Sequence, residues 1–122
     1  MSIVIIDDSP VVRGMLREML VQFEGAKVSG EFTSPAPAIA SIRINPPDVV
    51  LLDIQLVDGS GLDVLRAVRR EHPGVKVLVF TNFAEPVFRK RCLEAGAYAF
   101  YDKKSDLHAL RRTLHGLASP AG

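Results

Sequence analysis

The chain alternates between short apolar runs and longer segments in which apolar residues recur every three or four positions. Three of the apolar runs, at residues 3–6, 49–52 and 75–80, are rich in Val, Ile and Leu. Runs of this length and composition are typical of strands that are covered on both faces, as in parallel sheets. Residues 27–32 and 98–101 are weaker strand candidates, so five strands are predicted in total.

Helices are predicted in the segments that separate and follow these strands. The first has the clearest apolar face, formed by residues three or four positions apart: Val12, Met15, Leu16, Met19, Leu20 and Phe23. Side-chain oxygens that can cap a helix stand at four predicted N-terminal ends: Ser9, Ser34, Ser60 and Asp106. The remaining helix, the fourth, is expected to follow Glu85-Pro86 and to end at Gly96.

Strand and helix therefore alternate five times along the chain. This order predicts an α/β fold, a doubly wound (βα)5 domain whose five-stranded parallel sheet carries helices on both faces. Residues 1–118 are expected to form this domain, and residues 119–122 a frayed C-terminal tail. Doubly wound sheets bind their ligands at the carboxyl ends of the strands, so functional residues are expected there.

Composition narrows the class of protein. With 122 residues, 48% hydrophobic and 24% charged, the chain resembles one ordinary globular domain. Its 15 Lys and Arg residues against 14 Asp and Glu give a net charge of +1, so no direct contact with nucleic acid is expected. No apolar run approaches the ~20 residues of a membrane span, and Asp7 and Asp8 interrupt the first run where a signal peptide would continue. A cytoplasmic protein without membrane contact is expected.

The cysteine, the histidines and the basic residues receive plain structural interpretations. The single cysteine, Cys92, excludes an intrachain disulfide and is expected to be a buried thiol. The three histidines share no metal-ligand spacing and are expected to be exposed: His72, His108 and His115. The basic residues at 89–91 and 111–112 indicate a solvated face, or a surface that meets an acidic partner.

The residues that follow the predicted strands carry the candidate chemistry. Asp7 and Asp8 follow the first strand, Asp53 the third, Thr81 the fourth and Lys103 the fifth. Carboxylates brought together at one edge repel each other unless a cation neutralises them or one is protonated. Oxygen ligands suit Mg²⁺, which keeps open positions for phosphate oxygens, and a lysine and a hydroxyl suit a phosphoryl group. These residues predict an acidic Mg²⁺ site that handles phosphate.

Four segments resemble the receiver domain of bacterial two-component response regulators. Residues 5–9 resemble the acidic pair of that family, residues 51–53 with Gly61 its phosphoacceptor loop, Thr81 its hydroxyl residue, and residues 96–103 its Gly-Ala…aromatic…Lys signature. The order and separations match over residues 3–118. The resemblance implies the flavodoxin-like fold, with strand order 2-1-3-4-5.

The resemblance also implies the residues of a phosphorylation site. Asp53 would accept a phosphoryl group from a phosphohistidine on a sensor histidine kinase or a phosphotransfer protein. Mg²⁺ would be bound by Asp8, Asp53 and the backbone carbonyl of Gln55, with Asp7 acting through water. Lys103 would hold one phosphoryl oxygen.

A switch is implied in addition to the acceptor. Thr81 would hydrogen-bond a second phosphoryl oxygen, and Phe100 would move inward as Thr81 does so, although an aromatic residue in a strand is equally typical of plain core. The surface of the fourth helix, fifth strand and fifth helix would change its binding to a downstream protein or a C-terminal effector domain. The domain would catalyse its own phosphorylation and dephosphorylation and would not be an enzyme acting on other substrates.

Several positions depart from the common family pattern. Val57 and Lys104 stand where proline is usual, so the acceptor loop is expected to be less rigid and the peptide bond after Lys103 to be trans. Gln55 and Phe83, two residues after Asp53 and Thr81, stand at positions that influence the approach of water in this family. Phe83 is expected to cover that path, with Asn82 adding bulk, and so to prolong the life of the phosphorylated form.

Other functions are considered as well. A small Mg²⁺-dependent phosphohydrolase of the haloacid dehalogenase type also uses an aspartate nucleophile, but it needs Asp-x-Asp where Asp7 and Asp8 are adjacent. An FMN carrier needs a Ser/Thr-rich phosphate loop, and NAD binding needs a Gly-rich turn; the sequence has neither after the first strand. Turn aspartates that merely cap helices would account for Asp8 but not for Asp53, which ends an apolar run.

Overall fold

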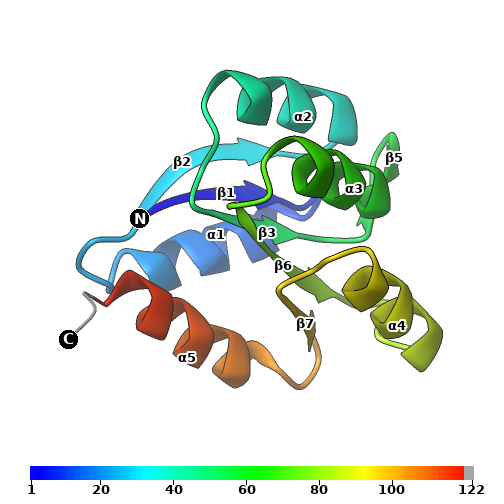
Figure 1. Ribbon diagram of the computed structural model, residues 1–122. Helices are drawn as coiled ribbons and strands as arrows, with labels where there is room; N and C mark the ends of the chain where they lie inside the picture. Colours follow the sequence, from blue (N-terminus) through cyan, green and yellow to red (C-terminus); the bar gives the residue numbers. More distant parts are fainter. Residues whose placement is uncertain (120–122) are drawn as a thin grey trace.

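Five parallel strands form one sheet in the computed structural model, which describes residues 1–119 (Figure 1). The strands are β1 (Ser2–Ile6), β2 (Lys27–Phe32), β3 (Val49–Leu52), β6 (Lys76–Thr81) and β7 (Ala99–Asp102). Their order across the sheet is β2-β1-β3-β6-β7. The predicted order 2-1-3-4-5 is thereby confirmed, because β6 and β7 are the fourth and fifth strands of this sheet.

Helices cover both faces of the sheet (Figure 1). The helices are α1 (Pro10–Leu20), α2 (Pro35–Ile44), α3 (Gly61–Glu71), α4 (Pro86–Glu94) and α5 (Leu107–Ala118). Buried side chains of α1 and α5 pack on one face, and those of α2, α3 and α4 on the other. The doubly wound α/β arrangement predicted from the sequence is confirmed.

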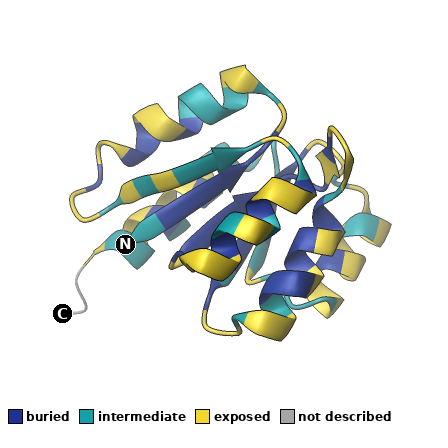
Figure 2. Ribbon diagram, turned by 90° about the horizontal axis from the view of Figure 1, so that it is seen from above, coloured by how far each residue is buried: buried dark blue, intermediate teal, exposed yellow. Residues whose placement is uncertain are grey.

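The apolar runs form the two cores on either side of the sheet. In β1, Ile3 and Ile5 pack with α1 and α5, whereas Val4 and Ile6 pack with α2 and α3. All four residues of β3 are buried, since this strand lies at the centre of the sheet. Figure 2 shows the central strands as buried and the outer faces of the helices as exposed. Continuous apolar runs therefore did indicate strands covered on both faces.

Two of the four predicted helix caps are present. The Oγ of Ser9 accepts a hydrogen bond from the Val12 N–H, and the Oγ of Ser60 accepts one from the Leu62 N–H. Ser34 stands at the N-cap of α2 without a side-chain cap bond, and nothing in the structure explains its absence. The Asp106 prediction was wrong in its contact, because Oδ2 accepts a bond from the Asp102 N–H, 2.9 Å away, and so closes the turn before α5.

A short hairpin in the acceptor loop was not foreseen. Strands β4 (Gln55–Leu56) and β5 (Gly59–Ser60) pair antiparallel, and Gly59 takes the positive φ of 150° that favours glycine in such turns. The Val57 N–H donates a hydrogen bond to the Thr33 carbonyl at 3.2 Å. Proline has no N–H, so Val57 supplies a restraint that the usual proline could not.

The remaining expectations concern single residues and the C-terminus. Cys92 is buried, and His108 and His115 are exposed, as predicted. His72 was predicted wrongly, because it caps the C-terminus of α3, is half-buried, and has an Nε2 without a hydrogen-bond partner among residues 1–119. Ser119 bonds to the carbonyl of His115, and the rest of the predicted tail lies outside the described residues.

The part of the chain that the structure describes has neither a cis peptide bond nor a membrane-spanning helix. Its peptide bonds are all trans, including the one after Lys103. None of its helices has the length and apolar character needed to cross a membrane.

Candidate functional site

The acidic residues meet because β1 and β3 are neighbours that end at the same level. Ile6 pairs with Leu52, and the hydrogen-bonding ladder continues one step further through the Asp53 N–H to the Ile6 carbonyl at 2.9 Å. On the other side of β1, the Asp7 N–H donates to the Phe32 carbonyl at 3.0 Å. The backbone of both aspartates is therefore fixed by the sheet itself.

Three carboxylates converge at this edge. One oxygen from each of Asp7, Asp8 and Asp53 lies within 4.8 Å of the others. Asp7 and Asp53 are buried, with 2% and 6% of their surface exposed, whereas Asp8 is exposed. The cluster predicted from the strand ends is present.

Lys103 joins the cluster from β7. Its N–H donates to the Thr81 carbonyl, which extends the pairing of β6 and β7 by one residue. Its Nζ lies 2.7 Å from Asp7 Oδ2 and 2.8 Å from Asp53 Oδ2, and its side chain is only 9% exposed. Three ionised carboxylates against one ammonium leave a formal charge of −2, which a divalent cation would balance.

Burial and hydrogen bonding shift the pKa values of Asp7 and Lys103 in opposite directions. Burial raises the pKa of Asp7 above its ordinary 3.8, and hydrogen bonds from Lys103 and the Ser9 N–H offset only part of that effect. Burial alone would lower the pKa of Lys103, but hydrogen bonds to Asp53 and Asp7 outweigh it and raise the pKa above 10.5. Lys103 is therefore a fixed positive charge at neutral pH.

The donor set at this edge fits Mg²⁺. Carboxylate and carbonyl oxygens are the protein ligands that this ion prefers. The Gln55 N–H points to Asp53 Oδ1 at 3.4 Å, so the backbone of Gln55 lies beside the Asp53 carboxylate. A Cβ at Gly61 would lie 2.1 Å from the Asp53 carbonyl oxygen, so only glycine lets the loop after Asp53 approach α3 this closely. The acidic cluster can hold a metal ion.

Thr81 offers a hydroxyl that donates no hydrogen bond to any of residues 1–119, so its hydrogen can serve a ligand. The residue is fully buried at the end of β6, and its Oγ1 accepts a hydrogen bond from the Phe83 N–H at 3.1 Å. A hydroxyl that accepts one bond can still donate another.

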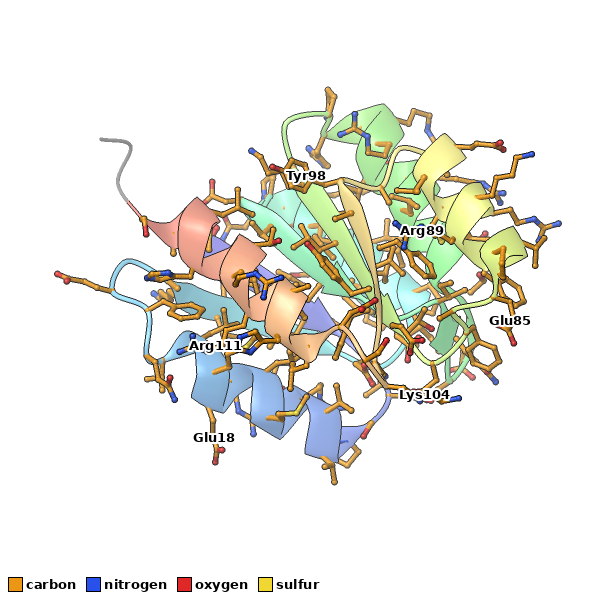
Figure 3. All side chains as sticks on the ribbon, turned by 90° about the horizontal axis from the view of Figure 1, so that it is seen from below. Glu18, Glu85, Arg89, Tyr98, Lys104 and Arg111 are labelled. Carbon is orange, nitrogen blue, oxygen red and sulfur yellow. The ribbon has the colours of Figure 1, made fainter. Side chains whose placement is uncertain are left out.

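Phe100 lies inside the protein. It pairs with Val79 in the sheet, is 5% exposed, and belongs to the core beneath α4. The guanidinium carbon of Arg89 lies 5.8 Å from the centre of its ring, and Figure 3 labels Arg89 on α4. This position fits both plain core and the inward position of a switch residue.

A groove beside the loop after Asp53 brings together two of the residues predicted to control the approach of water, Gln55 and Phe83. Its volume is about 270 Å³, and its walls include Gln55, Gly59, Phe83 and Phe88. Phe83 is 38% exposed and packs edge-to-face on Phe88, with ring centres 6.0 Å apart. Asn82, its neighbour, is exposed. Gln55 and Phe83 thus line one groove, which also contains Ile54, the residue after Asp53.

Sequence reasoning missed the contacts that hold the first acidic loop. The Ser9 N–H donates to Asp7 Oδ1 at 2.9 Å, and Arg13 Nη1 donates to the Asp7 carbonyl at 2.7 Å. The Ser9 bond has a sequence signal, because an aspartate often accepts a bond from the N–H two residues later. The Arg13 contact has none, since it depends on how α1 leaves the sheet.

The comparisons with known proteins agree with this geometry. The family model described as the response regulator receiver domain matches residues 3–115. The chain belongs to this family. Receiver domains of this family serve two-component signal transduction as switches controlled by phosphorylation, and the family generally uses Mg²⁺. Family membership favours the receiver over the phosphohydrolase and the FMN carrier.

Individual relatives give the same result. This receiver domain is 33% identical to the response regulator GacA of Pseudomonas syringae pv. syringae (strain B728a), over 87% of this chain and 50% of that protein. It is 42% identical to the probable transcriptional regulatory protein TcrX of Mycobacterium tuberculosis, over 99% of this chain and 51% of that protein. A solved two-component response regulator of the LuxR family from Aurantimonas sp. SI85-9A1 is 27% identical, with a TM-score of 0.87 over 96% of this chain and 84% of that chain. The receiver domain spans about half the length of these curated relatives.

Proposed function

We propose that Asp53 accepts a phosphoryl group from a phosphohistidine of a sensor histidine kinase or phosphotransfer protein. The observation that carries this proposal is the convergence of three carboxylates, two of which contact Lys103 Nζ, at the strand ends where doubly wound sheets bind ligands. The three are Asp7, Asp8 and Asp53, and Lys103 contacts Asp7 and Asp53. A carboxylate oxygen of Asp53 attacks phosphorus, a P–O bond forms, and the P–N bond breaks. The electron pair of the broken P–N bond stays on the departing imidazole.

The proposed metal ligands are Asp8, Asp53 and the backbone carbonyl of Gln55, with Asp7 acting through water. Bound Mg²⁺ would neutralise charge on the phosphoryl oxygens. The formal charge of −2 on the cluster supports this role.

Lys103 and Thr81 are proposed to sense the new group. A phosphoryl group adds a charge of about −1.5 to −2 near pH 7, which draws the Lys103 ammonium toward its oxygens. The free hydroxyl hydrogen of Thr81 is donated to another oxygen. Thr81 and Phe100 lie on neighbouring strands, so a shift of the β6–α4 segment changes the packing around the Phe100 ring.

The output surface is proposed to be α4, β7 and α5. Figure 3 labels Tyr98 and Lys104 at opposite ends of β7, with α4 and α5 on either side. The partner of this surface is a downstream protein or a C-terminal effector domain. The greater length of the relatives supports this proposal, as does the description of TcrX as a probable transcriptional regulatory protein. The exposed basic residues on these two helices favour an acidic partner: Arg89, Lys90, Arg91, Arg111 and Arg112.

The proposed role is that of a cytoplasmic switch that catalyses its own phosphorylation and dephosphorylation. Incubation with Mg²⁺ and acetyl phosphate is expected to give one acid-stable, hydroxylamine-labile phosphoryl group per chain, and EDTA is expected to prevent its formation. Continuous turnover of phosphate esters without such an adduct would instead indicate the phosphohydrolase.

A further inference from the structure

We propose that Arg13 is a positioning residue for the metal site, acting through the peptide group between Asp7 and Asp8. This inference rests on the proposed binding of Mg²⁺ at the acidic cluster. Arg13 lies in the first turn of α1, where its own N–H donates to the Ser9 carbonyl. Its guanidinium turns back over the acidic loop, and Nη1 donates to the Asp7 carbonyl oxygen at 2.7 Å.

Glu31 holds the guanidinium in that place. Arg13 Nε lies 3.3 Å from Glu31 Oε1, and the Arg13 side chain is only 19% exposed. Glu31 belongs to β2 and pairs with Ile5 of β1, two residues before Asp7. The sheet thus anchors Glu31, Glu31 fixes Arg13, and Arg13 fixes the Asp7 carbonyl.

Asp7 needs no further support for its own side chain. Lys103 and the Ser9 N–H hold its carboxylate, and the Phe32 carbonyl holds its N–H. Asp8 differs, because its carboxylate is exposed and makes no hydrogen bond or ion pair with any other described residue. The peptide plane that Arg13 holds sets the direction in which the Asp8 side chain leaves the backbone. Arg13 therefore orients the one carboxylate of the cluster that lacks its own restraint.

Charge alone would give the opposite effect. A guanidinium close to a cation site repels Mg²⁺, so removing a positive charge should strengthen binding if Arg13 acted only through its charge. Arg17 provides the matched control, because its Nη1 contacts the same Glu31 oxygen at 2.6 Å and it makes no hydrogen bond or ion pair with Asp7. The two arginines share a carboxylate partner and differ in the bond to the acidic loop.

The test measures Mg²⁺ affinity by calorimetry and by the amide resonances of Asp8 and Ser9, in protein without a phosphodonor. Replacing a group that orients a metal ligand typically costs about tenfold or more in metal affinity, so Arg13→Met is expected to weaken binding by about tenfold. Arg13→Lys, which keeps the charge and loses the guanidinium geometry, is expected to weaken it in the same direction. Arg17→Met and Arg17→Lys are expected to change affinity by less than about twofold.

Phosphorylation supplies a second readout. In Arg13→Lys, adduct formation from acetyl phosphate is expected to reach its half-maximal rate at a higher Mg²⁺ concentration than in wild type. At saturating Mg²⁺, its rate is expected to approach that of wild type. A purely structural defect would lower the maximal rate as well. Wild-type affinity in Arg13→Lys, or equal shifts in the Arg13 and Arg17 variants, would overturn the assignment of Arg13 alone. No Mg²⁺ binding by the wild-type protein would overturn the proposed metal site itself.

Discussion

Burial and the contacts with Lys103 shift the pKa of Asp7 in opposite directions. Its folded-state pKa is raised above 3.8, so the folded protein holds the Asp7 proton more tightly than the unfolded chain does. The stabilising contribution of this proton is complete below pH 3.8 and is lost as pH rises through the folded pKa. We expect carboxyl NMR titration to give a pKa above 3.8 without metal, and Mg²⁺ to lower it. A pKa at or below 3.8 without metal would contradict the burial argument.

Lys103 is predicted to stabilise the metal-free protein and to transmit phosphorylation. Lys103→Met leaves Asp7 and Asp53 without their shared ammonium, and breaking a buried pair typically costs about 3–5 kcal/mol. Denaturant unfolding is expected to show a loss of this order without metal and a smaller loss with Mg²⁺.

Phosphorylation of the same variant is expected to remain possible while its effect on the output surface is lost. Amide chemical shifts around Phe100 provide the measurement, because this residue lies between the site and α4. If phosphorylation shifts these resonances equally in wild type and Lys103→Met, Lys103 is not the sensor.

At the scale of elements, the sheet was predictable and the loops were less so. The central strands were found because burial on both faces leaves an unbroken apolar run, as in Val49–Leu52. The order of the parallel strands alone places four site residues at one edge, because parallel strands end together. These residues are Asp7, Asp53, Thr81 and Lys103. Their placement could therefore be predicted without any knowledge of side-chain contacts.

The features that were missed depend on contacts between elements distant in sequence. The hairpin of β4 and β5 has only two residues in each strand, too few for alternation to be visible. The hydrogen bond from the hairpin to the Thr33 carbonyl and the one from Arg13 to the Asp7 carbonyl depend on the relative positions of loops in the folded protein. Asp106 was misassigned because an aspartate before a helix can cap that helix or bond backward into the turn.

The loop after β6 and the hairpin are expected to set the lifetime of the phosphorylated form. Phe83 and Gln55 line one groove in the loop region that follows Asp53. We expect the apolar Phe83 ring to exclude the water that hydrolysis needs. Phosphoryl loss after removal of the donor is expected to be slower in wild type than in Phe83→Glu or Asn82→Ala. Equal or faster decay in wild type would mean that the Phe83 ring does not cover the path of water.

In the molecule as a whole, the acidic edge and the proposed output surface are separate but share the same strands. The acidic cluster lies beyond the carboxyl ends of β1 and β3, and β6 and β7 connect Thr81 and Lys103 to the packing beneath α4. Phosphorylation can alter the outer surface only by contacts that differ between the two states, and we propose that β6 and β7 carry those contacts.

The proposed switch depends on Asp53 as the residue that is phosphorylated. Wild type, Asp53→Asn and Asp58→Asn are incubated with Mg²⁺ and acetyl phosphate, and the adduct is quantified by intact mass and located by peptide mapping. Asp58 is the matched control, because it is an exposed aspartate in the same loop. We predict a single phosphoryl group on Asp53 in wild type and in Asp58→Asn, and none in Asp53→Asn, whose amide is not a nucleophile. An adduct at wild-type yield in folded Asp53→Asn would show that Asp53 is not the phosphoryl acceptor.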